Sequence, residues 1–157
     1  MNPNTSYTVD EAKAKLEAYC AYQERCYKEV REKLRQMKMI PQAQDVILQH
    51  LTKHDYLNET RFAEAFSRGK FRVKKWGRQR ITRELKQRQL SAYNIKKGLQ
   101  QIPESEYLTT FYELSQKRLD QLTETNKYKK RKKLADYLLY RGWESSLVYN
   151  RVTELIP

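Results

Sequence analysis

The stretch ITRELKQRQLSAYNIKKGLQQI, residues 81–102, decides the fold. Ile81 and Leu85 lie one helical turn apart, which places them on one face of a helix. Residues 87–89 end that helix, and Ser91 is a suitable N-cap for the next one. The second helix carries an apolar stripe at i, i+4 and i+7, formed by Ile95, Leu99 and Ile102. The stretch therefore predicts two helices joined by a short turn.

The apolar spacing of this stretch occurs three times along the chain. From Ile81 through Leu90 to Ile102 the steps are +4, +5, +5, +4 and +3. The pattern returns 53 residues later, at Leu134, Leu138, Trp143, Val148, Val152 and Leu155. It also stands 51 residues earlier, at Val30, Leu34, Met39, Gln44, Leu48 and Leu51, with Gln44 as its polar exception. Two matches without a gap indicate an internal structural repeat.

A further helical stretch precedes each pair. The first begins with a capping box, in which Thr8 is the N-cap and Glu11 the third helical residue. The second runs from about Glu59, and the third starts after Pro103. Near the end of the chain, Gly142 suits a helix C-terminus. No segment shows the alternation of a β-strand.

These observations predict an all-α protein, a tandem array of three three-helix repeats with an elongated or curved shape. We expect a near-neutral first repeat over residues 1–55 and a strongly basic second repeat over residues 56–102. The third repeat, residues 103–157, has a basic helix start at 127–133. Because units of about 50 residues bury too little surface to stand well alone, neighbouring repeats should pack together.

Charge is distributed unevenly along the chain. The 157 residues hold 32 Lys and Arg against 19 Asp and Glu, for a formal net charge of +13. Residues 1–60 are neutral overall, residues 61–100 carry +11, and residues 101–157 carry +2. A concentrated basic excess favours a polyanionic partner, such as nucleic acid or something attached to it.

Several protein classes are excluded by composition. No apolar run approaches the ~18 residues of a membrane span, and the N-terminus lacks the basic and apolar regions of a secretion signal. Cys20 and Cys26 are too few for a disulfide framework and lack the spacing of a zinc site. We therefore expect a soluble cytoplasmic protein with no cofactor and no membrane partner.

Two segments of the middle repeat resemble the RecX family of recombinase regulators. They are YLNETRFA, residues 56–63, and KWGRQRITREL, residues 75–85. The family pattern runs tyrosine-leucine-acid-acid into arginine-phenylalanine-alanine, followed by glycine, basic residues, isoleucine and glutamate-leucine. Asn58 replaces the first acid of that pattern, although Asn also caps helices well. Residues 29–34, EVREKL, look like the family's first repeat, and the last repeat is similar in length, helical pattern and basic character.

The resemblance implies a regulator and not an enzyme. RecX-like proteins are tandem three-helix repeats that bind RecA, in particular the RecA–DNA filament, and lie in its groove. They usually inhibit its ATP hydrolysis, strand exchange and co-protease activity, and so act in DNA repair, recombination and the SOS response. They need no cofactor, and some bind single- or double-stranded DNA directly. We expect this chain to act as a monomer.

Basic residues of the middle repeat are the first candidate binding site. In the helix from Arg78 to about Arg88, Ile81 and Leu85 mark the buried face, and the predicted solvated face carries Arg80, Arg83 and Lys86. Upstream, basic residues alternate with Phe71, Val73 and Trp76: Arg68, Lys70, Arg72, Lys74 and Lys75. Such interleaving can hold phosphates and stack bases, although Phe71 is expected in the core and Trp76 in either place. Gly77 is either a sharp turn between helices, which is the preferred interpretation, or a site of close backbone approach.

A second candidate lies at the basic helix start. Lys129, Lys132 and Lys133 point away from the side of Leu134 and Leu138. Lysines at a helix N-terminus oppose the macrodipole, which suggests a use such as phosphate contact.

The recognisable pair Arg61-Phe62 has a structural interpretation. Phe62 is expected in the core. Arg61 is expected to form a salt bridge with Glu59, with Glu64 or with a neighbouring repeat.

Other functions have weaker support. His50 and His54 stand at i, i+4 but lack a third metal ligand, and Asp120, Glu124 and Asp136 have no fixed geometry as a nuclease cluster. No phosphate-binding glycine loop or serine nucleophile motif is present. The alternative function is a stand-alone helical DNA-binding protein or repressor, although base-reading residues are few.

Overall fold

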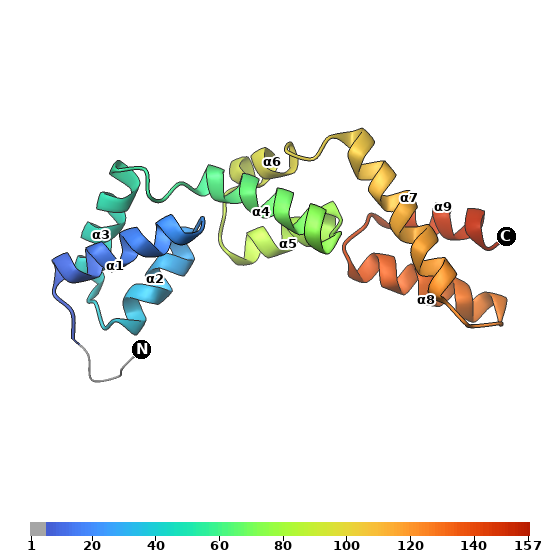
Figure 1. The fold of residues 1–157 in the computed structure, drawn as a ribbon, viewed down its shortest axis with the longest axis horizontal. Coiled ribbons are helices and arrows are strands. Elements are labelled where there is room, and N and C mark those ends of the chain that lie inside the picture. The colour runs from blue at the N-terminus through green and yellow to red at the C-terminus, as the bar shows by residue number, and fades with distance from the viewer. Residues whose placement is uncertain (1–5) are drawn as a thin grey trace.

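The computed structural model describes residues 6–157, which form helices and no strand. Their bounds are α1 Val9–Tyr22, α2 Tyr27–Gln36, α3 Pro41–Lys53, α4 Glu59–Lys74, α5 Arg78–Gln87, α6 Ala92–Leu99, α7 Glu104–Gln121, α8 Lys127–Tyr140 and α9 Ser145–Leu155. They follow one another in groups of three along an elongated body (Figure 1). The predicted all-α helical array is confirmed.

Several predicted helix starts are also confirmed. The capping box of α1 forms as expected, with Thr8 Oγ accepting from the Glu11 N–H at 3.1 Å. Helix α4 begins at Glu59. The Ser91 hydroxyl caps α6 by accepting from the Asn94 N–H at 3.1 Å.

The +5 steps of the repeat are explained by how the middle helix of each group ends. Helices α2, α5 and α8 are followed by a residue with positive φ: Lys38 at 61°, Gln89 at 63° and Gly142 at 92°. In each case the next N–H bonds back across the turn, as from Leu90 to the Leu85 carbonyl and from Trp143 to the Leu138 carbonyl, both at 3.2 Å. This is the Schellman motif, which spaces its two apolar residues five apart.

The second +5 step crosses into the next helix. Leu90 precedes the N-cap of α6, and Ile95 is the fourth helical residue, the two positions of a hydrophobic staple. All repeat positions are buried or half-buried. Gln44, the polar exception, is buried too, but its amide donates to the Met39 carbonyl at 2.9 Å and accepts from Arg31 at 3.4 Å. Its polar atoms therefore remain satisfied inside the core.

The apolar side chains gather into two cores. One lies within the first three helices and contains Leu16, Leu34 and Leu51. The other runs through α4–α9 and includes Phe62, Phe111 and Trp143. The second and third groups therefore share one core, to which Cys26 before α2 also contributes, while the other buried apolar side chains of the first group form a core of their own. The division at residues 55 and 102 stays a prediction.

Arg61 joins the first group to the second. Its guanidinium pairs with Glu24 at 2.6 Å and with Asp55 at 3.1 Å, and it donates to the Asp55 and Tyr56 carbonyls at 2.9 and 3.4 Å. The predicted structural salt bridge is present. Its partners lie in the neighbouring repeat and the linker, however, and not at Glu59 or Glu64 of its own helix. Phe62 is buried as predicted.

The Glu59 side chain serves the same junction. Its carboxylate accepts from the Tyr27 N–H, at the start of α2, at 3.1 Å. Burial raises the pKa of the Glu59 carboxyl above its ordinary value. On the other side of the junction, the Lys28 ammonium donates to the Gln87 carbonyl at the end of α5, at 3.0 Å.

Two glycines bring the second and third groups into backbone contact. The Gly77 N–H donates to the Arg141 carbonyl at 2.8 Å, and the Gln79 N–H to the Gly142 carbonyl at 2.9 Å. A Cβ on Gly77 would lie 2.4 Å from the Gly142 oxygen. Gly77 has φ −80°, which any residue adopts, so interpreting it as a glycine-requiring turn is wrong. Close backbone approach is what requires glycine here.

Trp143 completes this junction. Its indole N–H donates to the Lys75 carbonyl at 3.2 Å, and its ring packs 4.5 Å from Tyr107 and 5.2 Å from Phe111. The Tyr107 hydroxyl accepts from the Arg78 N–H at 2.9 Å and donates to Glu144. Burial, then the bond to Glu144, raises the pKa of Tyr107 above its ordinary value.

We expect Gly77→Ala to destabilise the protein by about 1–3 kcal/mol, because the added methyl overpacks the contact with Gly142. Gly69→Ala is the matched control. Gly69 lies within α4 with open space around it, so alanine should stabilise the helix by about 0.5–1 kcal/mol. Urea unfolding followed by tryptophan fluorescence measures both. Equal stabilities would contradict the proposed role of Gly77.

We expect Arg61→Ala to cost about 1–3 kcal/mol, because it leaves the half-buried Glu24 carboxylate without its cation. In contrast, the more exposed pair of Arg72 and Glu106 should contribute little, so Arg72→Ala should change stability by less than about 0.5 kcal/mol. Thermal unfolding of both variants tests the contrast. A loss no larger for Arg61→Ala than for Arg72→Ala would show that the Arg61 bridges do not stabilise the junction.

Candidate functional site

Helix α5 presents two free cations to solvent. Ile81 and Leu85 are fully buried, as the periodicity predicted. Arg83 and Lys86 are exposed, and within residues 6–157 neither side chain forms an ion pair. Glu84 is the only acid of the helix, and it pairs with Arg88 at 2.9 Å. The exposed face of α5 therefore carries uncompensated positive charge.

Arg80 does not belong to a solvated face. Its guanidinium lies 4.2 Å from the centre of the Trp76 ring and 4.9 Å from that of Tyr140, and it donates to the Tyr140 carbonyl at 3.4 Å. The expectation of a solvated Arg80 is wrong, because the end of α8 packs against the start of α5. A helical wheel of one helix does not contain that contact.

Arg78 is also engaged at the junction. It forms ion pairs with Glu104 and, at 3.6 Å, with Glu144, and its guanidinium lies 3.7 Å from the centre of the Tyr107 ring. Two carboxylates and a ring thus already compensate its charge. Arg78 therefore contributes to the structure of the junction.

The basic residues of α4 divide into engaged and free side chains. Arg68 donates to Gln101 at 2.9 Å, and Arg72 pairs with Glu106 at 3.4 Å. Lys70 lies 5.1 Å from the centre of the Trp76 ring. Lys74 and Lys75 are exposed, and neither forms an ion pair within the described residues 6–157.

The aromatic residues of this segment also differ. Phe71 is buried, as expected. Val73 is exposed, and Trp76 is half-buried with its ring 6.3 Å from Phe66. Lys70 and Arg80 both lie over the Trp76 ring, so cations already occupy the surroundings of the indole. Base stacking on Trp76 stays a prediction.

At the start of α8, acids offset the charge of two of the five lysines between residues 127 and 133. Lys132 pairs with Asp136 at 2.7 Å, and Lys133 pairs with Glu124 at 3.0 Å. Asn126 caps the helix by accepting from the Lys129 N–H at 3.0 Å. Hydrogen bonding from the Asn126 N–H, and then from Lys133, holds the pKa of the Glu124 carboxyl below its ordinary value. Lys129 is exposed, and no side-chain partner is found for it in the described chain.

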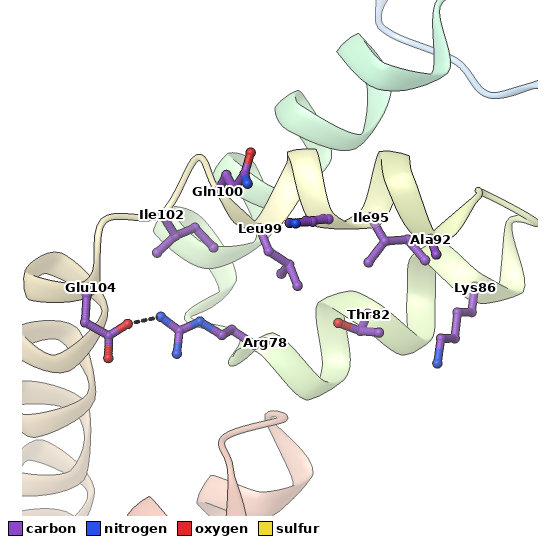
Figure 2. Close-up of a pocket in the computed structure, with 10 residues that line it drawn as sticks. Arg78, Thr82, Lys86, Ala92, Ile95, Leu99, Gln100, Ile102 and Glu104 are labelled. Carbon is purple, nitrogen blue, oxygen red and sulfur yellow. Dashed lines mark hydrogen bonds and ion pairs between the residues drawn. The ribbon is translucent and has the colours of Figure 1, made fainter.

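A groove between α5 and α6 was not predicted. It encloses about 570 Å³, and its apolar floor includes Ile95, Leu99 and Ile102. Figure 2 shows the Arg78–Glu104 ion pair at one end of the groove and Lys86 at the other. The periodicity assigned the floor residues to the core, which is largely correct, since Ile95 and Ile102 are more than 90% buried. The small exposed parts of these side chains line a groove only because α5 and α6 lie side by side.

The residues considered for a metal site or a nuclease site, and the two cysteines, have other surroundings in the structure. The His50 ring lies 3.3 Å from Glu17 and 4.6 Å from the His54 ring. Over residues 6–157 no group of three or more His, Cys, Asp and Glu could hold a metal ion. Burial raises the pKa of the Cys20 thiol to about 11 and that of Cys26 to about 12. Asp120 accepts from Gln116 at 2.9 Å, so the imagined nuclease carboxylates are each engaged separately. Among the described helices, none is long and apolar enough to cross a membrane.

Solved structures share this fold. A crystal structure of regulatory protein RecX matches with a TM-score of 0.82 and 19% identity, covering 93% of this chain and 73% of that one. RecX from Lactobacillus salivarius matches with a TM-score of 0.79 and 19% identity, covering 94% and 96%. At such low identity these likenesses establish the three-dimensional fold.

Two relatives are also similar to this chain in sequence. Regulatory protein RecX of Lactobacillus gasseri is 34% identical over 91 residues, which are 58% of this chain and 34% of the relative. Regulatory protein RecX of Listeria monocytogenes is 26% identical over 136 residues, 87% of this chain and 51% of the relative. The chain thus spans about half or less of the length of these relatives.

Family models identify two of the helix groups. The second three-helix domain of RecX matches residues 58–99, which include α4, α5 and α6. The third three-helix domain of RecX matches residues 104–150, from α7 into α9. The two segments together make up more than half of the chain, and with the RecX relatives they show that it belongs to the RecX family.

Proposed function

We propose that this protein regulates RecA by binding the RecA–DNA filament and inhibiting its ATP hydrolysis, strand exchange and co-protease activities. The observation that carries the proposal is the match of two successive helix groups to RecX domains. The elongated row of helix groups supports it, because a long body can span more than one subunit of a filament (Figure 1). Such bridging would hinder the motions that ATP turnover and strand exchange require.

The exposed cations of α5 are the proposed contact surface. Arg83 and Lys86 keep uncompensated charge, and Lys86 lies at one end of the apolar groove (Figure 2). Apolar surface bordered by positive charge suits an acidic protein patch, while free lysines and arginines also suit DNA phosphates. Lys74, Lys75 and Lys129 extend the proposed surface beyond α5. Arg78 and Arg80 are left out of it because the junction already engages them.

The protein would regulate by occupying the filament, as a monomer in the cytoplasm. This role needs no catalytic residue and no cofactor. Direct binding to single- or double-stranded DNA would add to the RecA contacts. DNA repair, recombination and the SOS response are the processes in which such regulation would act.

Addition of this protein at or below equimolar amounts should lower DNA-dependent ATP hydrolysis by RecA. The measurement is steady-state hydrolysis on single-stranded DNA at low salt, with the folded state checked by circular dichroism. Unchanged hydrolysis with folded protein would contradict the proposal. Preference for one duplex sequence over random competitor by orders of magnitude would instead indicate a stand-alone DNA-binding protein.

The double variant Arg83→Ala/Lys86→Ala should weaken inhibition and reduce its salt dependence. The reason is that two cationic contacts to phosphate or carboxylate groups are lost, together with the counterion release that accompanies them. Its stability should stay within about 1 kcal/mol of the parent, since both side chains are exposed. The matched control is Arg35→Ala/Lys53→Ala, which removes the same charges from exposed positions of α2 and α3. Equal loss of inhibition in both variants would show a general charge effect and move the site away from α5.

A further inference from the structure

A second cavity lies where the second and third helix groups meet. It encloses about 430 Å³ between the C-terminal end of α4, the second half of α7 and the end of α8. Five cations line it, and no carboxylate does: Lys74, Lys75, Lys117, Arg118 and Arg141. Three of these, Lys117 and Arg118 on α7 and Arg141 directly after α8, are not among the residues that the sequence predicted for the site.

These cations are not compensated by neighbouring acids. Throughout residues 6–157, the ion pairs of the protein involve none of the five. Arginines elsewhere do find carboxylates, as Arg61 does with Glu24 and Arg151 does with Glu154 at 3.1 Å. Like charges around one cavity repel one another, and solvent screens this repulsion least at the half-buried Arg118 and Arg141. The arrangement is therefore unfavourable unless an anion enters.

Tyr137 organises the two arginines. The guanidinium carbons of Arg118 and Arg141 each lie 4.6 Å from the centre of its ring, so they are separated by no more than twice that distance. Arg141 is held further by a 2.9 Å hydrogen bond to the Lys74 carbonyl at the end of α4. The fold therefore positions both guanidinium groups before any ligand binds.

Arg118 has an unused donor. Its Nε is buried, and within the described part of the chain it has no hydrogen-bond partner. A buried donor without an acceptor costs free energy, and a bound oxyanion would remove that cost.

We propose that this cavity binds the phosphate groups of an anion that carries several of them. Guanidinium forks match phosphate oxygens in pairs, and lysines add point charge. A single carboxylate would neutralise one charge of five, whereas a polyphosphate or a nucleic-acid backbone supplies several. That the carrier is a DNA strand rests on the proposed function, while the cavity's preference for phosphate does not.

Calorimetric titration of the full chain with tripolyphosphate tests the site without RecA. We expect binding that Lys117→Gln weakens about tenfold, the effect of one charged contact. Arg118→Lys, which keeps the charge but loses Nε, should also weaken it. Lys53→Gln, an exposed lysine on α3, should leave the affinity unchanged. Circular dichroism confirms that each variant is folded.

A second titration, with oligothymidylate, distinguishes the two sources of the bound phosphate, a nucleic-acid strand and a free polyphosphate. Competition by tripolyphosphate, together with weaker oligonucleotide binding by Lys117→Gln, would identify a nucleic-acid strand. Tripolyphosphate binding without such competition would identify a free polyphosphate. No tripolyphosphate binding, equal loss with Lys53→Gln, or polyglutamate bound as tightly as tripolyphosphate would overturn the proposal. None of these titrations contains RecA, so a failure of the phosphate site can be distinguished from a failure of the proposed RecA regulation in the hydrolysis assay.

Discussion

The backbone contact between Gly77 and Gly142 is the constraint on which the arrangement of the second and third helix groups depends. It brings the end of α8 onto the start of α5, closely enough for two interbackbone hydrogen bonds of 2.8 and 2.9 Å. Trp143 follows directly and is buried against Tyr107 and Phe111. One core can then run through six helices, which compensates for the small apolar content of each group.

The same contact decides which cations remain available. Arg78 and Arg80 lie on the first turn of α5, where the third helix group places Glu104, Glu144 and Tyr107 around Arg78 and the end of α8 places Tyr140 beside Arg80. Arg83 and Lys86, one and two turns further along, stay exposed. The approach of α7 and α8 to the end of α4 also encloses Arg118 and Arg141 beside Lys74. Positive charge is thus engaged within the junction and left uncompensated outside it.

The apolar spacing predicted the helices well because each step of the repeat is a local event. Steps of +4 and +3 follow from the helical turn, and the +5 steps follow from a Schellman end and a hydrophobic staple. Their hydrogen bonds lie within a few residues, as from Leu90 to Leu85. The candidate site was predicted less well. Arg83 and Lys86 are exposed as expected, but Tyr140 beside Arg80 comes from α8, and Glu24, which pairs with Arg61, comes from the loop between α1 and α2.

By itself, the sequence determined the helical class, the helix starts, the repeat and the concentration of charge in the middle of the chain. These depend on spacing, capping and composition, which are properties of neighbouring residues. Only the tertiary structure decided that Gly77 serves a close contact, that Arg78 and Arg80 belong to a junction, and that Lys117, Arg118 and Arg141 share a cavity with Lys74. The physical reason is that burial and charge compensation depend on groups 26 to 68 residues apart, and their distances exist only after the helices pack.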